Sequence, residues 1–423
     1  MHTIVIGAGI VGLATAWELR AAGHEITLLD PAPIGSDASA SYANGSMISP
    51  AFMIPVSNPG LWRQLPGYLV DPDSPLSMRF VDLPRLSIWA IRFMLAGATE
   101  ARLSRLASAL APLTRGAPAL HEGLSEAIGR PDLVRRTPLH YLYPDETARA
   151  GDHLAWGLRE HFGVATEQLN QRDIEGAVTK PPRGCEVGVV VPDSGLCADT
   201  AGYSKAIWHK LALGGATHLP RRAMGFDLEK ARVVGVNTPE GCLPCDNVVI
   251  AAGHASAKLA AALGDRVPLG VERGYSLQYP ENPIGLSTPM MLPSKRIAMT
   301  PNQLGLRVAG QVELAHPDAP PNWDHARILH KRAVEAYPEL DRLAGSAERW
   351  MGRRPSMADC KPVIGRSSRA DNAIYAFGHG HIGLTTAPRT ARSVLALINR
   401  DDPEIPIQPF SPRRFRFGQS IRD

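Results

Sequence analysis

The stretch that decides the fold is His2-Thr-Ile-Val-Ile-Gly-Ala-Gly-Ile-Val-Gly12, at the start of the chain. A run of strand-forming residues leads into a GxGxxG loop, and an apolar-periodic helix follows to about Ala22. A second strand over residues 25–29 ends at Asp30. This order predicts the first βαβ unit of a parallel, Rossmann-like sheet.

The glycine loop has the composition of a dinucleotide site. We expect Gly7 to form the tight turn, Gly9 to let the backbone approach a pyrophosphate, and Gly12 to let the helix pack closely on its strand. The helix N-terminus would then face the phosphates. Asp30 stands eighteen residues after Gly12, near the spacing at which a carboxylate accepts hydrogen bonds from an adenosine ribose. The sequence therefore predicts a bound dinucleotide.

A second glycine-rich loop, Gly378-His-Gly-His-Ile-Gly383, lies near the other end of the chain. A strand is expected before it at residues 372–377 and a helix after it at residues 385–398, with Pro388 in the first turn. No strand with an acidic residue follows, so this loop does not predict a second dinucleotide site. Closure of both chain ends on one long cofactor indicates FAD, whose reduced ring the positive helix end would stabilise.

Three segments between these loops have open interpretations. The small-residue run Ser39-Ala-Ser-Tyr-Ala-Asn-Gly-Ser46 either contacts a ligand or simply turns the chain. Residues 50–75, rich in proline and aromatic residues, are typical of an ordered loop over a pocket. The apolar stretch 86–98 is interrupted by Arg92 and is too short to cross a bilayer. It is either a helix on a membrane surface or a cap on a second domain, and we favour the cap.

Strand patterns later in the chain divide between two sheets. Residues 247–252 resemble a central parallel strand that returns to the first sheet, and Gly253 ends it before a helix. Alternation in residues 275–279 and 306–309 predicts antiparallel strands of a separate sheet on the substrate side of the pocket. Leucines at helical spacing in residues 100–128 predict an amphipathic helix that packs on a neighbour.

Composition limits the function classes. A chain of 423 residues exceeds the usual single core, so two domains are expected. The net charge of +4 is spread over the chain and does not indicate nucleic-acid binding. Five cysteines form no disulfide framework, Cys242 and Cys245 lack further zinc ligands, and we expect no metal. Because a strand begins at His2, we expect no secretory signal and a cytoplasmic location, with peripheral contact at the inner face of the membrane left open.

Several short motifs spread over nearly the whole chain carry a resemblance to a known family. They are Gly7 to Gly12 with Asp30, Ser41 to Ser46 with Ser49-Pro50, Ile250-Ala-Ala-Gly253, Arg273-Gly-Tyr-Ser276, Gly352-Arg-Arg-Pro355 with Asp359 and Pro362-Val-Ile-Gly365, and Gly378 to Thr385. Through them the chain resembles the D-amino-acid oxidase family, nearest the D-amino-acid dehydrogenases and D-hydroxyproline dehydrogenases. The expected fold is α/β, with a Rossmann-like FAD domain of glutathione-reductase type interleaved with an α+β substrate domain on a mainly antiparallel sheet. The expected FAD domain comprises residues 1–50, 150–265 and 350–423, and the substrate domain residues 51–149 and 266–349.

The resemblance also implies a substrate site. It makes Arg354 the anchor of a substrate carboxylate, for which the bidentate guanidinium is suited. The hydroxyl of Tyr275 would hydrogen-bond the substrate carboxylate or amine, although a strand tyrosine can equally serve packing. His381 would contact flavin or substrate, His379 would be structural, and Arg307 is a weaker candidate for the pocket wall.

The residues expected to hold FAD lie in the two glycine loops, the small-residue run and the turn after the central strand. They are Gly7, Gly9, Ile10, Val11, Gly12, Asp30, Ser39, Ser41, Asn44, Gly45, Ser46, Met47, Ala252, Gly253, Gly378, Gly380, His381, Ile382, Gly383, Leu384 and Thr385. The covalent flavin link of sarcosine oxidases needs a cysteine near residue 352, where this chain has Gly352. The resemblance therefore implies noncovalent FAD.

The implied reaction is hydride transfer from the α-carbon of a small D-amino or cyclic imino acid to flavin N5, with a proline-like ring as the preferred substrate. The amine would enter neutral, so no strong side-chain base is expected, and catalysis would come from orientation and electrostatics. Electrons would pass to a quinone or a carrier protein. The alternatives are an oxygen-using oxidase of glycine, sarcosine or D-amino acids, a flavin-binding relay subunit of a larger complex, and a nicotinamide-dependent reductase.

Overall fold

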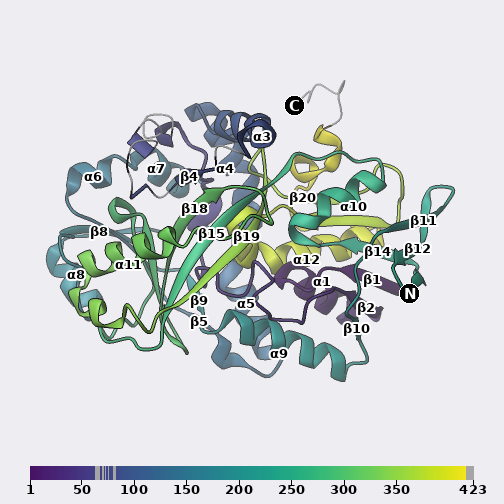
Figure 1. The fold of residues 1–423 in the computed structure, drawn as a ribbon, viewed down its shortest axis with the longest axis horizontal. Helices are drawn as coiled ribbons and strands as arrows, with labels where there is room; N and C mark the ends of the chain where they lie inside the picture. Colours follow the sequence, from purple (N-terminus) through teal and green to yellow (C-terminus); the bar gives the residue numbers. More distant parts are fainter. Residues whose placement is uncertain (62–66, 69–70, 72, 75, 80–81, 416–423) are drawn as a thin grey trace.

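The computed structural model describes residues 1–61, 67–68, 71, 73–74, 76–79 and 82–415, and it consists of two main sheets with helices packed around them (Figure 1). The first is a six-stranded sheet in the order β10-β2-β1-β14-β21-β20. Its strands are β1 (His2–Ile6), β2 (Glu25–Leu29), β10 (Thr217–Leu219), β14 (Asn247–Ile250), β20 (Val363–Arg366) and β21 (Ala373–Phe377). All neighbouring pairs are parallel except β20 with β21.

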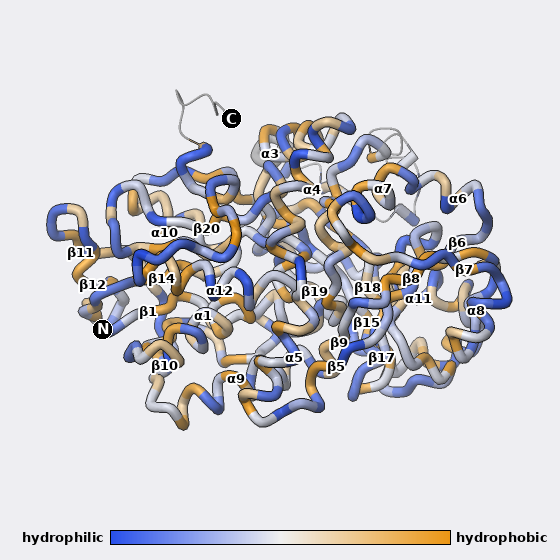
Figure 2. Tube along the Cα trace, turned by 180° about the vertical axis from the view of Figure 1, so that it is seen from behind, coloured by the Kyte–Doolittle hydropathy of each residue, from blue (hydrophilic) through white to orange (hydrophobic). Residues whose placement is uncertain are grey.

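The predicted βαβ opening is confirmed, with α1 (Ile10–Ala21) connecting β1 to β2. Because side chains alternate along a strand, each strand of this sheet contributes side chains to the cores on both of its faces. Val5 and Val249 pack with α1 on one face, whereas Ile4 and Val248 join the core on the other. Figure 2 shows that the residues at β14, inside this sheet, are hydrophobic. It also shows hydrophilic residues around α8 (Gln171–Ala177), at the edge of the molecule.

The second sheet has nine strands and is mainly antiparallel, as predicted. Its main path is β19-β15-β18-β17-β16-β6-β8-β7, with β4 paired to β18. The strands are β4 (Leu76–Met78), β6 (Leu139–Tyr143), β7 (Glu167–Leu169), β8 (Val187–Val191), β15 (Leu269–Tyr279), β16 (Met290–Leu292), β17 (Ile297–Asn302), β18 (Gly305–Leu314) and β19 (Glu348–Met357). The helix α11 (Asp324–Ala336) packs on β15 and β18.

Two small sheets and further helices complete the fold. The small sheets contain β3 (Met47–Ile48), β5 (Val134–Arg136) and β9 (Gly195–Cys197), and β11 (Gly225–Glu229), β12 (Arg232–Thr238) and β13 (Gly241–Pro244). The helices are α3 (Leu83–Ala96), α4 (Glu100–Thr114), α5 (Ala117–Ala127), α6 (Glu146–Ala150), α7 (His153–His161), α9 (Thr200–Leu213), α10 (Ser256–Ala262) and α12 (Gly383–Asn399). None of the helices in the described part of the chain has the length and hydrophobicity to cross a membrane.

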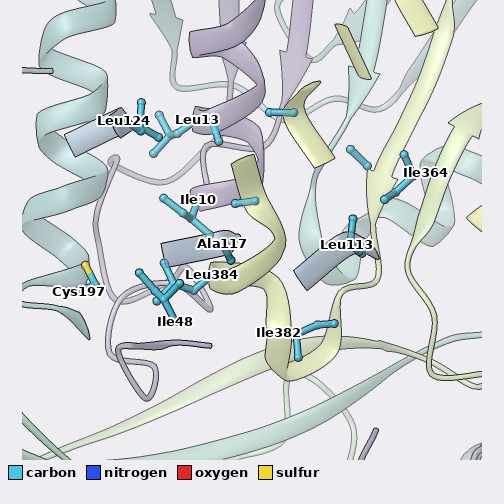
Figure 3. Packing of buried hydrophobic residues seen from close by; sticks show 14 of the residues in the cluster. Ile10, Leu13, Ile48, Leu113, Ala117, Leu124, Cys197, Ile364, Ile382 and Leu384 are labelled. Carbon is cyan, nitrogen blue, oxygen red and sulfur yellow. The ribbon is translucent and has the colours of Figure 1, made fainter. Parts of the chain in front are cut away.

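The division of the chain between the sheets differs in part from the expected ranges. β7 and β8 lie within residues 150–265, yet they pair in the large sheet. Conversely, α4 and α5 lie within residues 51–149 but pack against α12 of the first layer. Figure 3 shows Ala117 of α5 near Ile10 and Leu384 in this core. The leucine spacing of residues 100–128 predicts a buried helix face, but it does not identify the neighbour that covers it.

The helix α3 caps the edge of the large sheet, as favoured from the sequence. Trp89 packs on Gly270, where an added Cβ would lie 2.4 Å from the indole ring. Its indole N–H donates to the Ser356 carbonyl at 3.1 Å, and its ring stacks on Phe93 with centroids 5.0 Å apart. The inner face of α3 therefore covers the large sheet at β15 and β19.

Candidate active site

The glycine loop is shaped so tightly that side chains are excluded at two of its positions. Gly7 has φ +107°, and a Cβ there would lie 2.3 Å from the Ala251 carbonyl oxygen. A Cβ on Gly12 would lie 1.9 Å from the Gly7 oxygen. At Gly9, by contrast, the nearest atom would be 3.5 Å away, so the protein itself does not forbid a side chain there. The bare backbone at Gly9 leaves a cradle of the kind that a pyrophosphate requires.

The N-cap residue of α1 is a glycine, so no N-cap side chain occupies the first turn of this helix. Gly9 is the N-cap residue, and Ser41 Oγ accepts a hydrogen bond from the Ile10 N–H at 3.1 Å. The carboxylate of Asp30 accepts from the Ala8 N–H at 2.8 Å and from the Ala32 N–H at 2.9 Å, which fixes it beside the loop. The positive helix end and the oriented carboxylate fit the phosphates and the adenosine ribose of a dinucleotide.

The small-residue run is held between the glycine loop and the large sheet. Ser276 Oγ donates to the Ala43 carbonyl at 3.0 Å, and Thr300 Oγ1 donates to the Gly45 carbonyl at 2.9 Å. The run also contacts the glycine loop, since a Cβ on Gly9 would face the hydroxyls of Ser39 and Ser41. The sheet thus positions this run beside the cradle.

Arg307 belongs to the same anchoring system. Its Nη1 donates to the Asn44 carbonyl at 3.1 Å and to Ser46 Oγ at 3.0 Å, while its Nε donates to Gln278 Oε1 at 3.1 Å. Burial lowers its pKa to about 10. This placement does not support the expected role of Arg307 in the pocket wall, because its guanidinium contacts residues 44–46. Arg307 instead anchors the small-residue run to the large sheet.

The C-terminal loop brings a second helix N-terminus to the site. The short 3-10 turn η7 (Gly380–Ile382) follows β21, and α12 begins at Gly383, two residues before the expected start. Pro388 consequently lies in the second turn and not in the first, and it cannot donate to the Leu384 carbonyl. The ring Nε2 of His121 hydrogen-bonds that carbonyl at 2.6 Å instead. Figure 1 shows α12 beside α1, against which it packs.

A cavity lies between this loop, the large sheet and the segment after β3. Its lining residues are Phe52, Pro55, Val56, Phe93, Leu110, Glu272, Ser356, Met357, Cys360, Gly378, His379, Gly380, His381 and Ile382. The expected loop over the pocket is present at Phe52, in the turn η1 (Pro50–Met53), and at Pro55 and Val56. The rest of residues 50–75 lies partly outside the described residues.

Arg354 stands beside this cavity and has no hydrogen-bonded or ion-pair partner among the described residues. Its guanidinium lies over Gly274, where a Cβ would come within 2.3 Å of Cζ. Within the described chain the structure gives this guanidinium no hydrogen bond and no ion pair within 4 Å. Burial lowers the pKa of Arg354, and the nearby carboxylate of Glu272 opposes this effect. An unpaired, partly buried guanidinium is suited to a bidentate carboxylate.

The two histidines of the C-terminal loop have different surroundings. His379 is buried, and its Nε2 hydrogen-bonds Thr390 Oγ1 at 3.1 Å, a contact that agrees with the expected structural role, although His379 also lines the cavity. His381 lines the cavity and is exposed. Surrounding protein and the charge of Arg354 lower the pKa of His381 to about 4. His381 is therefore a neutral hydrogen-bonding group at neutral pH.

Tyr275 lies on the other face of the large sheet. Glu272 pairs directly with Arg354 across β15 and β19, so Tyr275, three positions along β15, projects away from them. Its hydroxyl donates to Glu313 Oε2 at 2.6 Å and accepts from the Asn322 N–H at 2.9 Å. This placement corrects the expected contact between Tyr275 and a substrate.

The same buried network contains an ion pair between Arg273 and Glu313, with 3.2 Å between Nη1 and Oε2. Both side chains are fully buried. No sequence motif marks this pair, or the cavity residues Glu272, Ser356 and Cys360, as part of a site. The missing information was the register of β15 with β19, which decides the residues of each strand that face the cavity.

Comparison with known proteins gives a consistent result. A family model described as FAD dependent oxidoreductase matches residues 2–397. The chain is 38% identical to the D-amino-acid oxidase of Bradyrhizobium diazoefficiens, over 98% of this chain and 99% of that protein. It is 30% identical to the D-amino acid dehydrogenase 2 of Ralstonia nicotianae, over 98% of this chain and 100% of that protein.

Solved structures share the fold. Glycine oxidase from Geobacillus kaustophilus superposes with a TM-score of 0.76 at 18% identity, covering 98% of both chains. L-proline dehydrogenase from P. horikoshii superposes with a TM-score of 0.73 at 19% identity, covering 98% of this chain and 97% of that one. The cradle at Gly9, the oriented Asp30 and the matched family agree, and the chain belongs to the family of FAD dependent oxidoreductases, with FAD as its cofactor.

Proposed function

We propose that the protein oxidises a small D-amino acid or cyclic imino acid, with a proline-like ring as the preferred substrate. The observation that carries this proposal is the guanidinium of Arg354 over Gly274, which no described residue pairs and which lies beside a cavity with a largely apolar wall. The names of the relatives from B. diazoefficiens and R. nicotianae support the substrate class. When bound, FAD supplies the hydride acceptor for the substrate α-carbon.

The residues proposed to hold FAD come from the glycine loop, the small-residue run, the turn after β14 and the C-terminal loop. The glycine loop and α1 would bind the pyrophosphate, Asp30 the ribose, and residues 39–47 the middle of the cofactor. The turn at Ala252 and Gly253 would contact it from β14, and residues 378–385 would hold the ring end. The free first turn of α12 directs a positive dipole there, which stabilises negative charge.

The substrate groups would be held by few residues. Arg354 binds the carboxylate through two parallel hydrogen bonds, and the missing side chain of Gly274 leaves room for its guanidinium. His381 presents a neutral ring at the cavity wall. Phe52, Phe93 and other apolar residues exclude water, which strengthens each polar contact. No role at the substrate is proposed for Tyr275.

We propose a quinone or a protein carrier as the electron acceptor, reached by peripheral contact with the inner face of the membrane. The outer face of α3 supports this, because Ile88, Ile91 and Leu95 are exposed at helical spacing, with Arg92 also exposed beside them. Sedimentation with anionic phospholipid vesicles tests the contact. Replacement of Ile88 and Ile91 by serine should abolish co-sedimentation, and wild-type protein that stays in the supernatant would contradict the proposal.

Oxygen is the second candidate acceptor, favoured by the 38% identity to a named D-amino-acid oxidase. Turnover of the holoenzyme with D-proline under air and under nitrogen, each with and without a soluble quinone, separates the two. A dehydrogenase needs the quinone under both gases, whereas an oxidase consumes oxygen without it. A relay subunit would show flavin but no turnover with any amino or imino acid.

A further inference from the structure

Glu272 is a buried carboxyl group in the wall of the cavity. It lies in the first half of β15, is 6% exposed and lines the cavity together with Ser356 and His381. It stands directly opposite Arg354 in the antiparallel pair of β15 and β19, so both side chains project from the same face of the sheet. The site therefore presents a carboxyl group and a guanidinium side by side.

The charged and titratable groups around Glu272 come from three directions. Arg354 faces it from β19, Cys360 from the turn after β19, and His381 from η7. His381 is neutral, because its pKa is lowered to about 4, and burial raises the pKa of the Cys360 thiol. Among the groups that these elements direct at Glu272, Arg354 is thus the cation.

Glu272 and Arg354 nevertheless form no ion pair within 4 Å in the described structure. Two buried charges that form no ion pair with each other destabilise the folded protein unless other charged groups neutralise them. An α-amino acid carries a carboxylate and an ammonium on adjacent atoms, which matches the two protein charges with opposite signs. A ligand of this kind would satisfy both groups at once.

We propose that Glu272 binds the substrate nitrogen and accepts its proton while Arg354 holds the carboxylate; this inference rests on the proposed function. One N–H bond of the substrate ammonium breaks, its electron pair stays on nitrogen, and the proton passes to a Glu272 oxygen. The neutral amine then has the lone pair that assists departure of the α-hydride to FAD. The catalytic base, which the sequence did not predict, is Glu272.

The surroundings of Glu272 support proton acceptance. Burial raises the pKa of its carboxyl group, while Ser356 and Arg354 lower it. When a substrate carboxylate engages Arg354, the lowering effect of that cation on the Glu272 pKa is offset. Substrate binding thus makes Glu272 a stronger base at the moment when the proton must leave. The same contact distinguishes amino and imino acids from 2-hydroxy acids, which offer no ammonium group.

Binding of two ligands that cannot be oxidised tests this role in the FAD-loaded protein. 2-Aminoisobutyrate has a carboxylate and an ammonium but no α-hydrogen, and isobutyrate is of similar shape without nitrogen. We expect the wild type to prefer 2-aminoisobutyrate. In Glu272→Gln this preference should fall by roughly 10- to 100-fold, with isobutyrate affinity preserved. Calorimetry and perturbation of the flavin absorbance give the dissociation constants.

Matched variants separate the possible explanations. Glu348→Gln removes a carboxylate from an exposed position of the same sheet and should leave the preference intact. Glu272→Asp should restore part of the preference, and flavin content reports folding of each variant. The pH profile of kcat/KM for a D-amino acid should lose its acid limb in Glu272→Gln, with a rate loss of roughly 100-fold or more.

The results distinguish this inference from the function on which it rests. If Glu272→Gln keeps the wild-type preference and acid limb while Arg354→Met loses both ligands, the proposed function stands and the role of Glu272 is overturned. If the wild type binds neither ligand and Arg354→Met changes nothing, the proposed function itself fails and this inference fails with it.

Discussion

The guanidinium of Arg354 occupies the space above Gly274, where a Cβ would come within 2.3 Å of its Cζ. The absence of a side chain in β15 therefore sets the position of a side chain in β19. Because the guanidinium is the far end of a flexible side chain, an added methyl group would displace it without unfolding the sheet. This relationship allows the proposed carboxylate site to be tested without removal of its charge.

Gly274→Ala should lower kcat/KM for an amino-acid substrate by roughly tenfold or more, since displacement of a positioned binding group by about an ångström is costly. Steady-state kinetics with a D-amino acid measures the effect, and flavin content confirms folding. Gly157→Ala is the matched control, because a Cβ there meets nothing within 4 Å. Unchanged kinetics in Gly274→Ala would remove Arg354 from the substrate site.

Glu313→Gln should reduce the free energy of unfolding by about 3–5 kcal/mol, because Arg273 would remain fully buried without its counter-charge. Tyr275→Phe removes only the hydroxyl that hydrogen-bonds Glu313 and should cost about 1 kcal/mol. Urea unfolding followed by circular dichroism gives both values. Neither kcat nor KM should change greatly in Tyr275→Phe, and a large loss of activity at normal stability would return Tyr275 to the substrate site.

Acid should release the flavin completely from the protein. Gly352 offers no thiol, and the pKa of Cys360, the cysteine at the cavity, is raised by burial, so its thiolate is scarce. Precipitation with trichloroacetic acid should leave yellow supernatant and colourless protein, in Cys360→Ser as in the wild type. Flavin retained by the wild-type pellet and released from Cys360→Ser would instead identify a covalent link.

Stability should fall as the pH decreases from about 6.5 towards about 4. The pKa of His121 is lowered to about 4 by burial, so between these values the unfolded chain binds a proton that the folded chain does not. The contribution is present above the unfolded pKa and is lost progressively until the folded pKa is reached. Thermal midpoints across this range should show a smaller decline in His121→Asn, and an identical decline in both proteins would exclude His121 as a source.

Much of the fold could be predicted because its signals are local. The turn at Gly7, the acid at Asp30 and the helix after Gly383 follow from short motifs whose geometry depends on neighbouring residues. The assignment of β7 and β8 was missed, since a strand pattern does not name its partner strand.

The side chains of the substrate site required long-range information. Tyr275 and Glu272 stand three residues apart, and strand alternation places them on opposite faces. Only the pairing of β15 with β19, far away in the sequence, shows that the face of Glu272 is the one with Arg354. The contacts of Arg307 with the 44–46 backbone likewise depend on a loop that is distant in the sequence. The sequence alone therefore does not show that Arg307 binds this loop and does not line the pocket.

Anaerobic reduction of the bound flavin tests the central claim most directly. The FAD-loaded protein is mixed without oxygen with D- and L-forms of amino acids, including proline and hydroxyproline, and with sarcosine, and the loss of flavin absorbance is followed. We predict rapid bleaching by D-forms, strongest with proline-like rings, and none in Arg354→Met. A yellow protein that stays oxidised with every amino and imino acid would contradict the carboxylate site at Arg354 and the proposed function.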